Sequence, residues 1–191
     1  MTVIFTGMRS SELRGLRWQD VDFKTGEVHV RQRVDQFRQV GKTKSGAGFR
    51  TIPVPPLVIT ALKTLKLKQQ PDATVVFANP EGTTRSYSNV VSKGLQPAWI
   101  RAGICSPTGE VTKRGKPIMR AKYTGLHSLR HFFASWMINR KEDGGLGLPV
   151  KVVQERMGHS SITMTMDTYG HLFPRLDDGT ELADAANALL S

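Results

Sequence analysis

Apolar and polar residues alternate with the period of a β-strand in the first part of the chain. This pattern predicts two strands, at 18–23 and 27–34, joined by a turn at 24–27. A glycine-rich, basic tip at 42–48 precedes a further strand at 49–52, which ends at a proline. These segments predict a small antiparallel sheet with a basic loop at one end.

Helical spacing dominates the remainder of the chain, where apolar residues recur every three or four positions. A short helix with a serine cap is also expected before the sheet. Helices are predicted at 10–16, 56–69, 86–102, 127–139, 150–157 and 162–168, and a terminal one follows the Asp178–Glu181 capping box. The predicted fold class is α+β, mainly helical with a small antiparallel three-stranded sheet.

Charge is distributed unevenly over the 191 residues. The chain has 27 Lys and Arg against 16 Asp and Glu, a formal charge of +11. Residues 1–130 hold 22 of these cations and 8 of the anions, whereas residues 131–191 hold 5 and 8. A basic body with an acidic tail favours a polyanion-binding surface, with nucleic acid as the partner. The alternative on charge alone is an ordinary solvated basic surface.

Composition excludes several classes of protein. Apolar residues make up 39% and charged residues 23%, which is typical of a globular domain. Apolar runs are too short to cross a bilayer, and the first residues lack a signal peptide's basic and apolar segments. A single cysteine, Cys105, excludes an intramolecular disulfide and a multi-cysteine zinc site. We expect no membrane association and an intracellular, cytoplasmic setting.

Four short stretches carry candidate chemistry, and each has an ordinary structural explanation when taken alone. Arg9 lies just before a helix start, and Lys44 lies on the glycine-rich tip. His127 and Arg130 are three residues apart, so they share one helix face, as in a phosphate clamp. His131 is expected to point elsewhere. The last stretch holds His159 after a glycine and, ten residues later, Tyr169, which could equally be a packing residue.

Together these stretches resemble the tyrosine recombinase (phage integrase) family in order and separation. The matching motifs are Thr-Gly-Met-Arg-Ser-Ser-Glu-Leu at 6–13, His-Ser-Leu-Arg-His at 127–131 and Met-Gly-His-Ser-Ser at 157–161. The resemblance extends from Thr6 to about Phe173. It implies a tyrosine recombinase catalytic-domain fold over residues 1–173, a C-terminal tail helix at 174–191, and the catalytic set Arg9, Lys44, His127, Arg130, His159 and Tyr169.

The resemblance also implies the reaction. Tyr169 would attack a DNA phosphodiester, leaving a 3′-phosphotyrosyl link and a free 5′-hydroxyl that later reverses the step. Arg9 and Arg130 would clamp the non-bridging phosphate oxygens with paired hydrogen bonds. Because the arginines supply positive charge and the ester conserves bond energy, neither a metal nor another cofactor is expected.

The remaining roles concern protons. His127 is the expected proton acceptor for the tyrosine, and His159 is expected to hydrogen-bond the scissile phosphate. Lys44 suits the general acid that protonates the departing 5′-oxygen, although Lys42 could share or replace it. Glu12 is expected to be structural, either holding the neighbouring arginine or capping its helix.

The resemblance leaves several points open. Family members usually carry a DNA-clamping domain ahead of the catalytic domain, but the first motif here starts near residue 6, so we expect a catalytic-domain fragment. Its expected partner is double-stranded DNA at an attachment-type site. We expect a homotetramer on that DNA, although the fragment could also be a monomer. In a bacterial host the expected location is the nucleoid. The basic segment 105–125, expected to be a loop or hairpin, either contacts DNA or is decoration. The tail packs either on a neighbouring subunit or on its own domain.

Two other functions are alternatives to a site-specific recombinase that serves DNA integration. A type IB topoisomerase uses a similar set of residues, but the Gly-His-Ser-Ser stretch at 158–161 favours the recombinase. A catalytically silent DNA-binding fragment is the alternative that involves no enzyme.

Overall fold

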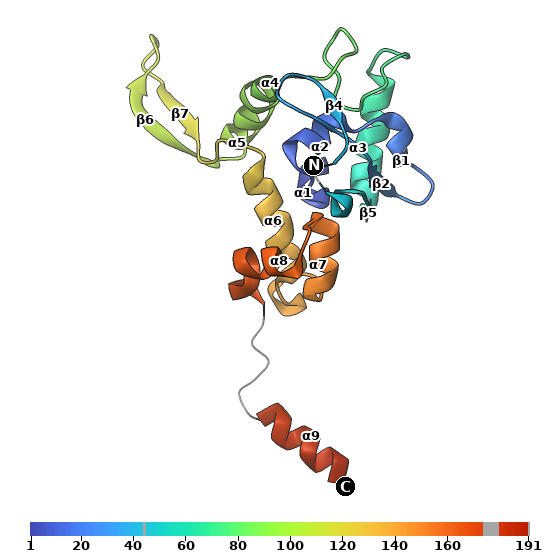
Figure 1. Cartoon of the computed structure of the whole chain (residues 1–191). Helices are drawn as coiled ribbons and strands as arrows, with labels where there is room; N and C mark the ends of the chain where they lie inside the picture. Colours follow the sequence, from blue (N-terminus) through green and yellow to red (C-terminus); the bar gives the residue numbers. More distant parts are fainter. Residues whose placement is uncertain (44, 174–179, 191) are drawn as a thin grey trace.

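The computed structural model describes residues 1–43, 45–173 and 180–190. Helices dominate, and the small sheets lie mainly in the first part of the chain (Figure 1). Within the described residues no helix is long and apolar enough to cross a membrane. The helices are α1 (Thr2–Thr6), α2 (Ser10–Gly15), α3 (Pro56–Leu67), α4 (Tyr87–Val90), α5 (Gln96–Arg101), α6 (His127–Ile138), α7 (Val150–Met157), α8 (Ile162–Tyr169) and α9 (Thr180–Leu190).

The predicted three-stranded antiparallel sheet is present. Its strands β1 (Val21–Asp22), β2 (Glu27–Val30) and β5 (Arg50–Pro53) lie in the order β1-β2-β5. Val28 pairs with Val21 on one side and with Ile52 on the other, so alternate residues face the core. Two further pairs are β3 (Arg33–Val34) with β4 (Val40–Gly41), and β6 (Cys105–Val111) with β7 (Pro117–Ala121).

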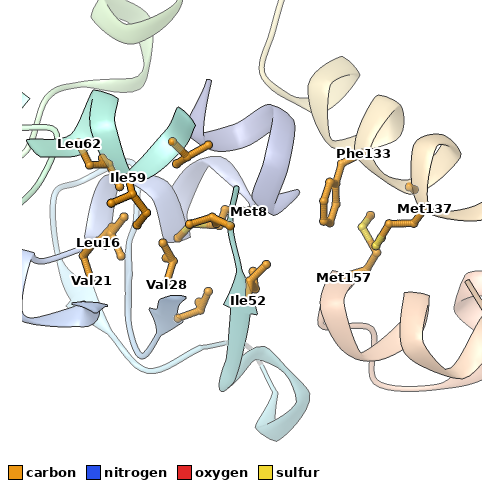
Figure 2. Packing of buried hydrophobic residues seen from close by; sticks show 14 of the residues in the cluster. Met8, Leu16, Val21, Val28, Ile52, Ile59, Leu62, Phe133, Met137 and Met157 are labelled. Atoms are coloured by element: carbon orange, nitrogen blue, oxygen red, sulfur yellow. The ribbon is translucent and has the colours of Figure 1, made fainter. Parts of the chain in front are cut away.

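The core has two parts that meet at Met8 (Figure 2). One part lies between the three-stranded sheet and α3, where Val28, Ile52 and Leu62 are fully buried. In the other part, Phe133 and Met137 of α6 pack against Met157 of α7. The chain between α1 and α2 therefore runs through the middle of the domain. The residues of this junction belong to the site described below.

Three predicted elements differ in the structure, and local interactions explain the differences. Residues 18–20 form a 3-10 turn instead of a strand, since the Arg17 and Asp20 side chains pair across it at 2.7 Å. The helix predicted at 86–102 is interrupted by a π-helical segment, Val91–Leu95, between α4 and α5. Pro97 follows that segment and has no N–H to continue the α-helical ladder, which accounts for the change of register. The N-cap of α2 is Arg9 and not a serine.

Two segments extend from this body in Figure 1: the β6–β7 hairpin and α9. The hairpin resolves the choice between loop and hairpin for residues 105–125. The described side chains of α9, at 183–190, are exposed. Asp178, the cap of the predicted capping box Asp178–Glu181, lies outside the described residues, and α9 begins at Thr180.

Candidate active site

The junction between α1 and α2 fixes the first arginine. Gly7 ends α1 with a left-handed φ of 56°, and a side chain at that position would collide with the ring of Phe133. The chain then turns into α2, whose N-cap is Arg9. Glu12 accepts hydrogen bonds from the backbone nitrogen and from Nη1 of Arg9, both at 2.9 Å. The guanidinium is thereby oriented by its own helix.

Glu12 is the centre of a buried ionic cluster. Its side chain is 3% exposed, and it also accepts a hydrogen bond from Nη2 of the buried Arg50 at 2.9 Å. Burial alone would raise the pKa of Glu12, but the hydrogen bond and charge of Arg50, together with those of Arg9, bring the pKa below its ordinary value. Glu12 therefore stays ionised, and it both caps α2 and holds Arg9.

Arg130 is the second guanidinium, and it is 3% exposed. From α6 it donates through Nη1 to the carbonyl of Gly7 and through Nη2 to the carbonyl of Met157 at 2.6 Å. Burial and the charge of Arg9 lower the pKa of Arg130 to about 10, so the group stays positive at neutral pH. Arg130 thus connects the α1–α2 junction to the end of α7.

Arg9 and Arg130 line the same pocket, of about 340 Å³, although they lie far apart in the sequence. Its lining also includes His127 and Tyr87, and the full set is Met8, Arg9, Ser10, Ser11, Tyr87, Leu126, His127 and Arg130. Burial lowers the pKa of His127, and the neighbouring His131 and the two arginines lower it further. The pocket is therefore positive, with a neutral imidazole at its edge.

His159 occupies the turn after α7. Gly158 ends that helix with a φ of 64°, and a side chain there would lie 2.7 Å from Nη1 of Arg50. The Gly158 carbonyl accepts a hydrogen bond from Nη2 of Arg9 at 3.1 Å, which brings the turn to the arginines. Burial and the nearby arginines lower the pKa of His159 to about 4, so its ring is neutral at neutral pH.

Tyr169, at the end of α8, is 5% exposed and packs into the main core. Its ring stacks on His159 with centroids 6.4 Å apart. Its hydroxyl is 2.8 Å from Nδ1 of His131. Burial raises the pKa of Tyr169, while the charge of Arg130 acts in the opposite direction. The phenol is therefore protonated at neutral pH and already has a hydrogen-bond partner.

The expectation that His131 points away from the site was wrong. His131 is one helical turn from His127, and their rings lie edge to face at 4.5 Å. The i, i+4 spacing places both rings on the same side of α6, and that spacing was the signal available in the sequence. Tyr87 was also missed, and only the three-dimensional fold brings it to the arginine pocket.

Two candidates from the sequence remain, Lys44 and Lys42. Lys44 lies outside the described residues. Lys42 is described at the start of the same tip, where its carbonyl accepts a hydrogen bond from Nε of Arg33 at 3.1 Å. Among residues 1–43, 45–173 and 180–190, no group of three or more His, Cys, Asp or Glu is placed to hold a metal ion.

Comparison with known proteins gives a consistent result. The profile of the phage integrase family matches residues 1–175. A "Tyrosine recombinase XerC-like" protein of Caldanaerobacter subterraneus subsp. tengcongensis is 29% identical over 89% of this chain and 44% of its own length. "Prophage integrase IntR" of Escherichia coli K12 is 28% identical over 98% of this chain and 45% of its own. The chain thus spans less than half the length of these relatives.

Solved structures share the fold. The Tn1549 transposon integrase in complex with transposon right end DNA has a TM-score of 0.68 at 20% identity, covering 98% of this chain and 57% of that one. The XerA recombinase has a TM-score of 0.58 at 21% identity, covering 97% and 55%. These likenesses confirm the predicted mainly helical catalytic-domain fold. With the profile match over nearly all of its length, the chain belongs to the tyrosine recombinase (phage integrase) family.

Proposed function

We propose that this chain is the catalytic domain of an integrase-type site-specific recombinase, which cuts and rejoins DNA through a covalent 3′-phosphotyrosyl intermediate. The observation that supports this most is the convergence of Arg9 and Arg130 on one pocket, close to a tyrosine whose hydroxyl is already hydrogen-bonded to an imidazole. On this proposal residues 1–173 form the catalytic domain and residues 174–191 form a tail.

The electrostatics of the pocket favour a phosphodiester. Two guanidinium groups in one pocket repel each other, and the pKa of Arg130 is lowered by burial first and then by the charge of Arg9. An anion between them removes the repulsion and gains charge-assisted hydrogen bonds. The same donors stabilise the extra negative charge that develops on the phosphate oxygens during attack. His159 adds a neutral hydrogen-bonding group beside them.

The reaction balances without any further reagent. The Tyr169 oxygen bonds to phosphorus while the bond from phosphorus to the 5′-oxygen breaks. A histidine near the phenol takes the tyrosine proton, a role for which His127 is the sequence-based candidate. Lys44 gives a proton to the departing 5′-oxygen. Attack by another 5′-hydroxyl reverses each transfer, and the strand is rejoined.

The wider DNA contact is proposed to include the β6–β7 hairpin. Both of its strands are largely exposed, and a two-stranded hairpin alone is only marginally stable in water. Residues 105–125 hold five cations and one anion, and within the described part of the chain none of the five forms an ion pair. The cations are Lys113, Arg114, Lys116, Arg120 and Lys122.

DNA held through such contacts is released by salt as counterions return to the phosphates. We also propose assembly as a homotetramer on an attachment-type site and a location on nucleoid DNA. Within that assembly, we propose that the tail packs either on a neighbouring subunit or on its own domain.

The test of the function is capture of the covalent intermediate. The probe is a library of nicked duplexes of random sequence, in which a released fragment cannot return to reverse the cut. We expect a protein–DNA band that survives denaturing electrophoresis, and sequencing of the captured DNA identifies the cleavage site. Binding without any such band favours the silent DNA-binding fragment, and relaxation of a supercoiled plasmid without strand exchange favours the topoisomerase.

The general acid is tested with the site identified in that way. Lys44→Ala should slow cleavage by about 10²–10⁴-fold, since the 5′-oxygen then leaves without a proton. A duplex with sulfur in place of the bridging 5′-oxygen should restore the rate, because a thiolate leaves unprotonated. The measurement is the single-turnover rate on both duplexes.

Lys42→Ala is the matched control and should cleave both duplexes at rates near those of the original chain. If Lys42→Ala shows the loss and the sulfur rescue instead, the acid is Lys42. Loss in both variants indicates a shared role.

A further inference from the structure

The three imidazoles of the candidate site have different positions relative to the Tyr169 hydroxyl. His159 stacks on the phenol ring in nearly parallel planes, 8° apart, and its Nδ1 pairs with Oγ1 of Thr165 at 2.9 Å. His127 lines the arginine pocket. Within the described residues, His131 provides the hydrogen bond to the Tyr169 hydroxyl, at 2.8 Å through Nδ1. Proximity to the proton that must leave therefore distinguishes His131 from the other two.

We propose that His131 accepts the Tyr169 proton during cleavage, and that His127 serves the phosphate instead. This inference rests on the proposed function. As the phenol oxygen bonds to phosphorus, its proton passes to Nδ1 of His131, and His131 returns a proton to that oxygen when the strand is rejoined. For the hydroxyl to donate, the neutral ring carries its own proton on Nε2.

The surroundings of His131 suit an acceptor that must gain and lose charge. The ring is exposed to solvent, so its proton can exchange with water. Among the described residues, the ring packs against His127, four positions earlier on α6, and against Tyr169 of α8, and Arg130 precedes it in sequence. His159 lies beyond Tyr169, on whose ring it stacks. The pKa of His127 is lowered by burial, by His131 and by the arginines, which makes its imidazole a weaker base.

The experiment compares His131→Ala, His131→Gln and His127→Ala in the single-turnover capture assay. We expect His131→Ala to form the adduct about 10²–10⁴-fold more slowly, with DNA binding unchanged. Added imidazole should restore part of the rate in proportion to its neutral form as pH is varied, because the vacated position is open to solvent. Sulfur at the bridging 5′ position should not rescue this variant, since leaving-group protonation is intact.

His131→Gln separates proton transfer from positioning. Glutamine can still hydrogen-bond the phenol but cannot accept its proton at neutral pH, so this variant should be as slow as His131→Ala. His127→Ala should be slow without rescue by imidazole.

The proposal fails if His131→Gln retains near-original activity, if His131→Ala is unchanged or faster, or if imidazole rescues His127→Ala instead. These outcomes differ from failure of the proposed function, in which the original chain itself forms no adduct. Thermal unfolding of each variant checks that the fold is retained; alanine favours the helix at this exposed position.

Discussion

Replacing Tyr169 with phenylalanine is expected to abolish the covalent adduct while leaving DNA binding nearly unchanged. The phenyl ring can still fill its buried place in the core and stack on His159, so only the hydroxyl and its hydrogen bond to His131 are lost. No other atom of the side chain can attack phosphorus. The measurement is the denaturing-gel assay with nicked duplex, alongside a gel-shift titration.

The chain contains two other tyrosines, and they provide matched controls. Tyr87→Phe and Tyr123→Phe should both keep the adduct. Tyr123 stacks against Trp99 at the base of the hairpin with centroids 5.6 Å apart, whereas Tyr87 lines the arginine pocket. Residual adduct in Tyr169→Phe would move the nucleophile elsewhere, and mass spectrometry of the DNA-linked peptide would then identify it.

Arg130→Lys is expected to reduce the cleavage rate by about 10²–10³-fold, the usual effect of losing a transition-state hydrogen-bond donor. Lysine keeps the charge but not the planar fork that can serve several oxygens at once. The single Nζ of lysine would replace two separate donor nitrogens, so we expect the carbonyl of Gly7 or of Met157 to lose its partner, and one buried carbonyl left unpaired costs about 1–3 kcal/mol of folding free energy.

Two measurements separate these effects of Arg130→Lys. Urea unfolding gives the change in folding free energy, and single-turnover cleavage is followed at a temperature where circular dichroism shows the variant fully folded. Arg101→Lys, at an exposed position near the end of α5, should match the original chain in both. Near-normal cleavage by Arg130→Lys would contradict the role of a paired guanidinium at the phosphate.

Sequence reasoning succeeded where a local pattern determines the structure. Alternation between positions 27 and 34 predicted a strand that the structure divides into β2 and β3, and the apolar spacing from position 127 predicted α6. It failed where distant or competing interactions decide. Trp18 is in a turn closed by a neighbouring ion pair, and Pro97 changes the register of a helix that the apolar pattern alone would continue.

In the candidate site, too, local motifs were predictable from the sequence, whereas contacts between distant segments were not. Motif order was sufficient to choose Arg9, His127 and Arg130, which the fold brings to one pocket. The contact between Tyr169 and His131 depends on how α8 packs beside α6, and no periodicity within either helix specifies that packing. The buried pair of Glu12 with Arg50 likewise joins segments far apart in sequence. The role of Lys44 stays a prediction.

The hydrogen bond from Arg9 to the Gly158 carbonyl joins positions 149 residues apart. During translation Arg9 leaves the ribosome long before its partner has been made, and Tyr169 is later still. On the proposed function, a nascent or prematurely terminated chain can therefore carry the basic surface but cannot break a strand. If Tyr169 is the nucleophile, the order of synthesis itself keeps incomplete copies of the enzyme from cutting the DNA of the producing cell.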